Sequence, residues 1–92
     1  MIRSFRHKGL RQLFIEGDRS KLRADQADKA ERILQRLAEA QAPSHMALPG
    51  YRLHPLKGEF AGFWAVSVSG NWRIVWRFDG PDAADVDLID YH

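Results

Sequence analysis

The spacing of hydrophobic residues predicts two helices in the first half of the chain. Over residues 8–16, apolar residues recur at the three- and four-residue spacing of one helical face, and Gly17 follows where a helix would end. The residues of that apolar face are Leu10, Leu13 and Phe14. From about residue 24 to residue 40, apolar positions again recur at helical spacing among good helix formers, and Pro43 prevents the helix from continuing. The sequence therefore predicts helices over residues 8–16 and 24–40.

The hydrophobic pattern changes to alternation after Gly50, which indicates β-strands. Glycine, asparagine, aspartate and proline cluster between the alternating segments, as they do in the turns of antiparallel sheets. A short alternating segment also opens the chain. Pro55 is expected to end the first of the later strands, because proline cannot donate to a ladder. The predicted strands are residues 2–5, 51–54, 63–68, 72–78 and 86–91.

This order of elements, β-α-α-β-β-β-β, predicts an α+β fold. Two N-terminal helices would pack on one face of a curved, mainly antiparallel sheet. Along residues 72–78, alternation separates an aromatic side that faces the helices from a side that carries arginines. The helix-facing residues are Trp72, Ile74, Trp76 and Phe78, and the opposite ones are Arg73, Val75 and Arg77. With 92 residues, the chain is expected to form one domain, residues 1–92.

Composition excludes several classes of protein. The absence of cysteine excludes a disulfide scaffold, a cysteine zinc site and thiol catalysis. No apolar run approaches the length of a membrane span, and the first residues lack the apolar segment of a signal peptide. The histidines lack paired ligand spacing, and the acids between residues 79 and 87 resemble a calcium loop only loosely. We therefore expect a cytoplasmic protein with no membrane contact, no metal and no cofactor.

Charge is distributed unevenly along the chain. Residues 1–42 contain ten lysines and arginines against six acids, whereas residues 43–92 contain four against six. The first eleven residues carry four cations and no acid, namely Arg3, Arg6, Lys8 and Arg11. Such a distribution is typical of a protein with an anionic partner on one side, although a solvated face is the simpler interpretation of any single charge run.

The β-rich half carries the residue types needed for acid–base chemistry and phosphate binding. His54 precedes Pro55, which favours extended backbone at the histidine, and Lys57 follows three residues later. Asp90 and His92 would share one face of a regular strand and Tyr91 the other, so all three meet in one site only if the strand ends before Tyr91. The simpler interpretations are a structural histidine beside a turn lysine and a frayed chain end.

The two arginines on the outer face of residues 72–78 have different expected roles. Arginine is well suited to bind phosphate, and Arg73 is predicted to do so. Arg77 is expected to pair across strands with an acid such as Asp87 or Asp90. Asp85 and Asp87 make the last strand acidic, and they could also pair with Arg73 and Arg77.

Three segments together resemble the HigB-type toxins of the RelE/ParE superfamily. They are Leu53–Gly58 (LHPLKG), Gly62–Ile74 (GFWAVSVSGNWRI) and Asp90-Tyr91-His92, and the opening residues 2–10 also fit that family. The resemblance extends over nearly the whole chain. It implies a microbial-RNase-like fold and a ribosome-dependent endoribonuclease that cuts translated mRNA in the ribosomal A site without a metal. It also implies a small helix-turn-helix antitoxin (HigA-like) as partner, with operator DNA bound only through the complex.

The resemblance assigns roles to individual residues. His54 and His92 would be the acid and base in an order left open, and Asp90 would orient a histidine or serve as an alternate base. Tyr91 would contact the substrate nucleotide, while Lys57 and Arg73 would hold the phosphate. The cations at the chain start, and others on the second helix, could contact ribosomal RNA; those on the helix are Lys29, Arg32 and Arg36. The alternatives are a gyrase-inhibiting toxin of the same superfamily and an inactive module that only binds an antitoxin.

Overall fold

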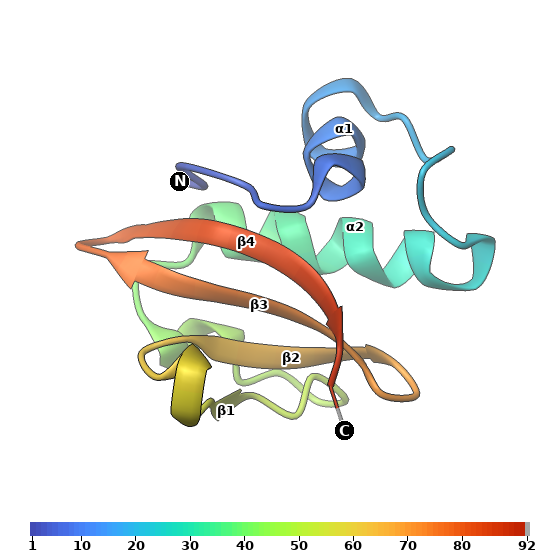
Figure 1. Ribbon diagram of the computed structural model, residues 1–92. Coiled ribbons are helices and arrows are strands. Elements are labelled where there is room, and N and C mark those ends of the chain that lie inside the picture. The colour runs from blue at the N-terminus through green and yellow to red at the C-terminus, as the bar shows by residue number, and fades with distance from the viewer. Residues whose placement is uncertain (92) are drawn as a thin grey trace.

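Two helices cover one face of a four-stranded antiparallel meander in the computed structural model, which describes residues 1–91 (Figure 1). Helix α1 is Lys8–Glu16 and helix α2 is Ala24–Glu39. The strands are β1 His54–Pro55, β2 Trp64–Ser69, β3 Trp72–Asp79 and β4 Asp82–Asp90. They lie in the order β1-β2-β3-β4 with antiparallel neighbours, so the predicted α+β class and helix-on-sheet arrangement are confirmed.

Both helices form where local signals predict them. The Nδ1 of His7 accepts a hydrogen bond from the backbone N–H of Leu10 and so caps the first turn of α1. Gly17 ends α1 in the left-handed region, with φ 71°, and its N–H donates to the carbonyl of Leu13. The predicted apolar face of α1 is correct for Leu10 and Leu13, whereas Phe14 is 37% exposed and contacts the ring of Phe5.

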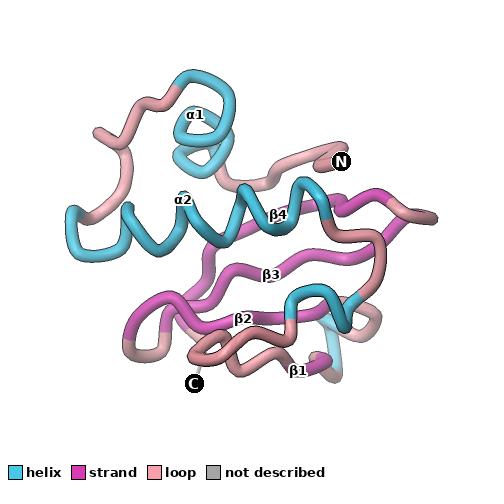
Figure 2. Tube along the Cα trace, turned by 180° about the vertical axis from the view of Figure 1, so that it is seen from behind, coloured by secondary structure: helices cyan, strands magenta, loops and turns pink. Residues whose placement is uncertain are grey.

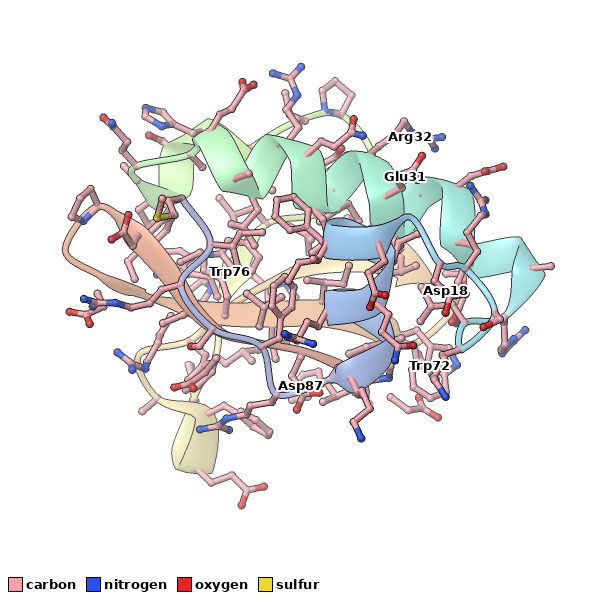
Figure 3. All side chains as sticks on the ribbon, turned by 90° about the horizontal axis from the view of Figure 1, so that it is seen from above. Asp18, Glu31, Arg32, Trp72, Trp76 and Asp87 are labelled. Carbon is pink, nitrogen blue, oxygen red and sulfur yellow. The ribbon has the colours of Figure 1, made fainter. Side chains whose placement is uncertain are left out.

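The main core lies between the helices and the sheet. Figure 2 shows both helices on the same side of the strands, and Trp76, labelled in Figure 3, is buried in this core. The β3 residues predicted to face the helices all belong to this core, with Ile74 and Trp76 fully buried. A second, smaller cluster on the other face contains Leu56, Phe63, Ala65 and Val75, with Phe60 and Ile89 packed against it. The outer face is therefore partly covered by the connection between β1 and β2.

The predicted first strand is wrong as a regular strand. Residues near the N-terminus run parallel to β4 and form isolated bridges, Ile2 with Ala83 and Phe5 with Val86 (Figure 1). Between these bridges β4 bulges at Asp85, whose φ is +54° and whose N–H donates to the side chain of Ser4. A bulge leaves residues unpaired and interrupts the ladder, which is why no continuous strand forms here.

Two of the later strands, the first and the last, differ from prediction by more than one residue. The expected strand over residues 51–54 is wrong, because Arg52 has a φ of +52° and β1 contains only His54 and Pro55. Pro55 is tolerated because β1 is the edge of the sheet. Strand β4 begins at Asp82 rather than residue 86, because a tight turn returns the chain directly onto β3, with Asp82 opposite Asp79. It ends at Asp90, one residue earlier than predicted.

Two short 3-10 helices were not predicted. They are Pro43–Met46, which buries Met46 completely, and Gly58–Phe60 in the connection to β2. Neither α-helix combines the length and apolar character needed to cross a membrane, and this holds for the described part of the chain.

Candidate active site

His54 occupies a fixed position at the edge of the outer face of the sheet. It is paired with Ala65 of β2, and its ring Nδ1 lies 2.9 Å from the carbonyl oxygen of Arg52. A carbonyl can only accept, so Nδ1 carries the hydrogen of this bond. The neutral ring then has its lone pair on Nε2. Nε2 is therefore the nitrogen at which His54 can take up and release a proton.

Tyr91 lies beside His54. The two ring centroids are 6.5 Å apart and the planes are inclined by 45°. The backbone N–H of Tyr91 donates to the carbonyl of Asn71 at 2.8 Å, which ties the residue to the β2–β3 hairpin. The side chain is 39% exposed, so its ring and hydroxyl remain accessible. The structure thus brings together two of the predicted catalytic residues from opposite edges of the sheet.

Asp90 approaches the same end of the sheet from the other face. It is the last residue of β4 and lies opposite Trp72, a residue of the helix-facing side. It lines a surface hollow of about 350 Å³ around the β2–β3 hairpin. Because β4 ends at Asp90, the strict alternation that separates Asp90 from Tyr91 ends there as well. His92, the remaining predicted catalytic residue, lies outside the described residues.

Arg73 is held against the β2–β3 hairpin on the His54 side of the sheet. Its Nη1 donates to the carbonyl of Gly70 at 2.8 Å and to that of Trp72 at 3.1 Å. Its Nε is buried without a partner among the described residues, as is the hydroxyl of Ser67, its cross-strand partner on β2. Within residues 1–91, the guanidinium is therefore positioned by backbone carbonyls rather than neutralised by a carboxylate. Lys57 is exposed at the start of the turn after β1, three residues from His54.

Arg77 is neutralised, as the cross-strand interpretation predicts, but its partner is Asp85 rather than Asp87 or Asp90. Its Nε donates to Asp85 Oδ2 at 2.7 Å. That hydrogen bond and the positive charge lower the pKa of Asp85, and the carboxylate in turn raises the pKa of Arg77. The β4 bulge brings Asp85 to this position. Arg77 is thus committed to a structural ion pair.

The cations near the N-terminus are divided between paired and exposed side chains. Arg3 forms an ion pair with Asp79, and Arg6 lies 3.8 Å from Asp85. Lys8 and Arg11 are exposed on α1, and no ion pair of either is found within residues 1–91. Part of the predicted patch is therefore offset by acids of the β3–β4 hairpin.

One residue of the site was missed by sequence reasoning. Arg52 supplies the carbonyl that holds His54, and it does so from the left-handed region, which is uncommon for arginine. The sequence placed Arg52 inside a strand, so no local signal pointed to this role. A search of residues 1–91 finds no group of three or more histidine, aspartate or glutamate side chains arranged to hold a metal ion.

The sequence was compared with known proteins. Residues 3–92 match a protein family described as a RelE-like toxin of the type II toxin–antitoxin system HigB. A protein of Proteus vulgaris named Endoribonuclease HigB is 40% identical over 92 residues, which is the full length of both chains. Both matches include the segment that contains His54 and Tyr91.

Proposed function

The chain belongs to the family of RelE-like toxins of HigB type II toxin–antitoxin systems, and on that premise we propose that it acts as a single-domain endoribonuclease that cuts translated mRNA in the ribosomal A site. The observation that carries the proposal is the arrangement of His54, whose Nδ1 is fixed to a carbonyl, whose Nε2 has no hydrogen-bond partner among residues 1–91, and whose ring lies beside that of Tyr91. The full-length similarity to a protein named an endoribonuclease supports the same reaction class.

The chemistry is attack of a ribose 2′-OH on the adjacent phosphorus. The O2′–P bond forms, the P–O5′ bond breaks, and the products are a 2′,3′-cyclic phosphate and a 5′-hydroxyl. A base takes the 2′ proton and an acid returns a proton to the leaving O5′. Nε2 of His54 is positioned to carry out one of these transfers, and His92 is proposed for the other. Asp90 is proposed to orient a histidine.

Cations and an aromatic ring complete the proposed site. The phosphorane-like intermediate carries extra negative charge, which fixed positive groups stabilise. Arg73 is proposed to supply this charge, since backbone carbonyls hold its guanidinium and no carboxylate pairs with it among the described residues. Lys57 is proposed to add a second positive charge from the turn after β1. Tyr91, exposed beside His54, is proposed to contact the substrate nucleotide. This scheme uses side chains alone and calls for no metal or cofactor.

The partners follow from the family and the target. Members of a type II toxin family act with an antitoxin, which we propose is a helix-turn-helix protein that recruits operator DNA only as part of the complex. The 70S ribosome is proposed to position the mRNA, with Lys8 and Arg11 contacting ribosomal RNA through phosphates. A ribosomal target places the protein in the cytoplasm.

The test is primer extension on an mRNA that has been incubated with the protein in a purified translation system. One reaction contains ribosomes and the other lacks them. His54→Asn is the decisive variant, because its amide nitrogen can replace Nδ1 against the Arg52 carbonyl while no group replaces Nε2. We expect cuts at discrete A-site codons only with ribosomes, and a rate about 10²–10⁴-fold lower for the variant. His45→Asn is the matched control, since His45 is exposed on the 3-10 helix Pro43–Met46 and its Nδ1 accepts a hydrogen bond from the backbone N–H of Gln41. Translation without cuts would refute the proposal and direct attention to gyrase inhibition.

A further inference from the structure

Basic side chains on this protein fall into two groups. Most arginines of the N-terminal segment, the α1–α2 connection and the β3–β4 hairpin have a carboxylate within 4 Å; they are Arg3, Arg6, Arg19, Arg23 and Arg77. The other nine lysines and arginines form no ion pair within the described part of the chain, and three of them, Lys29, Arg52 and Arg73, act on one another electrostatically. The second group therefore carries positive charge that the protein itself does not offset.

The fold brings these three cations together from separate segments. The carbonyl of Tyr51 accepts a hydrogen bond from the N–H of Ser67 at 2.7 Å, so residue 51 lies alongside β2. Arg73 is the partner of Ser67 on the other side of β2. Arg52 and Arg73 thus flank one strand, about 10 Å apart at the backbone if each step has the usual sheet spacing.

Lys29 joins the cluster from helix α2. Its Nζ donates to the carbonyl of Gly50 at 3.1 Å and lies 5.8 Å from the centre of the Tyr51 ring. Burial is the largest cause of a lowered pKa for Lys29, and the positive charges of Arg32, Arg52 and Arg73 lower it further. The three charges that lower the pKa of Lys29 are thus all of its own sign. A cluster of like charges is unfavourable until an anion occupies it.

The cluster also connects two features of the surface. On one side, the backbone of Arg52 holds His54 through its carbonyl. On the other, Tyr51 lines a hollow of about 500 Å³ with Arg32 and Arg36 of α2, and Figure 3 shows Arg32 on the outward side of that helix. Cations therefore extend from the candidate active site towards α2, with the Tyr51 ring among them, and Glu39 is the one acid that lines the hollow. Basic tracks with accessible aromatic rings are typical of single-stranded nucleic-acid binding sites.

We propose that Lys29, Arg52 and Arg73 form a binding site for the phosphate backbone of single-stranded RNA, in which Arg52 contacts phosphate beside the scissile position. The inference rests on the proposed ribonuclease function. It adds Arg52 and Lys29 to the residues that contact RNA, and it gives the path of the RNA across the surface. The RNA extends from His54 over Arg52 towards the hollow on α2. The cluster binds RNA without the ribosome, because its charges are preassembled in the free protein.

The experiment measures binding of a fluorescent 2′-O-methyl oligonucleotide by anisotropy, since that RNA lacks the nucleophile and is not cut. Arg52→Gly removes the guanidinium while glycine readily adopts the left-handed backbone at this position. Arg52→Lys retains the charge. Lys21→Ala is the matched control, because Lys21 is an exposed cation in the α1–α2 connection, outside the cluster. Circular dichroism confirms that each variant is folded.

For Arg52→Gly we expect binding about tenfold weaker at low salt and a log–log salt slope reduced by about 0.7, the value for one phosphate contact on a single strand. Arg52→Lys should restore the slope, and Lys21→Ala should change affinity by less than about twofold. Three results would overturn the inference: wild type that does not bind the oligonucleotide, Arg52→Gly that binds like wild type, or an equal loss in Lys21→Ala. If the binding site is refuted but the same wild-type preparation still cuts mRNA with ribosomes, the proposed ribonuclease function holds. If the protein binds the oligonucleotide but does not cut mRNA, the ribonuclease function is refuted and the RNA-binding site holds.

Discussion

The ion pair between Asp85 and Arg77 should stabilise the protein by an amount that depends on pH. Arg77 Nε and Asp85 Oδ2 are 2.7 Å apart, and the side chains of Arg77 and Asp85 are 42% and 28% exposed, respectively. Exposed ion pairs contribute about 0–1 kcal/mol and charge-assisted hydrogen bonds about 1.5–3 kcal/mol. Because this pair lies between those cases, Asp85→Asn should lower the free energy of unfolding by about 1 kcal/mol at pH 7, or the melting temperature by about 4–8 °C.

The sign of the pH dependence follows from the direction of the pKa shift. The hydrogen bond from Arg77 lowers the pKa of Asp85 in the folded protein. A carboxylate of lowered pKa stabilises the fold above its unfolded pKa of about 3.9, and this stability is lost as the pH falls through the folded value. The difference between wild type and Asp85→Asn should therefore be constant from about pH 7 to 5 and shrink below about pH 4. Asparagine is the suitable replacement, because it also tolerates the φ of +54° at this position.

Urea unfolding followed by circular dichroism across that pH range measures the effect. Asp28→Asn serves as control, since Asp28 pairs with Arg19 on the surface and its side chain is 75% exposed. That variant should leave the urea midpoint at pH 7 unchanged, because solvent screens an exposed ion pair. An Asp85→Asn loss of equal size at pH 7 and pH 3 would show that packing, rather than charge, causes it. No loss at pH 7 would refute the reasoning altogether.

Two further predictions concern the framework that supports the site. Gly17→Ala should lower the free energy of unfolding in urea by about 1–2 kcal/mol. Residue 17 has a φ of +71° and a Cβ there would meet no atom within 4 Å, so the backbone conformation alone sets this cost. An unchanged urea midpoint would contradict the prediction. Met46→Ala should lower the free energy of unfolding by about 2–5 kcal/mol, because Met46 is fully buried in the main core, and a loss below that range in thermal melting would mean that the core closes over the cavity.

Sequence predicted the elements that local signals define. Both helices begin and end within a residue of their predicted limits, because a periodic apolar face and a glycine or proline stop signal are properties of the segment itself. The β1 error has the opposite origin. Whether Pro55 ends a strand or lies in one depends on whether that strand is a sheet edge, and the left-handed Arg52 depends on its tertiary surroundings. The acids near β4 likewise suggested a loop, while the register with β3 extends the strand back to Asp82.

The candidate site was predictable only in part for the same reason. Alternation placed Arg73 on the face opposite the helices, and the resemblance to HigB-type toxins named His54 as an acid or base and Tyr91 as a contact of the substrate nucleotide. Neither source predicted the hydrogen bond that leaves Nε2 of His54 free, because it needs the backbone of Arg52 turned towards the ring. The partner of Arg77 also depended on a bulge at Asp85 that no local pattern showed.

The ion pairs make the distribution of unpaired positive charge uneven over the molecule, which the net charge of +2 does not show. Arg3, Arg6 and Arg77 are offset by acids of the β3–β4 hairpin, so the field from that end of the sheet is weakened. The cations at the β1 edge keep their charge, and this is the edge at which His54 presents Nε2. Because unpaired cations dominate the attraction of a polyanion at distances below the Debye length, RNA should be drawn to the β1 edge rather than to the hairpin. On the proposed function, Asp79 and Asp85 then have two effects: they stabilise the bulged edge through their ion pairs, and they weaken the attraction of RNA to it.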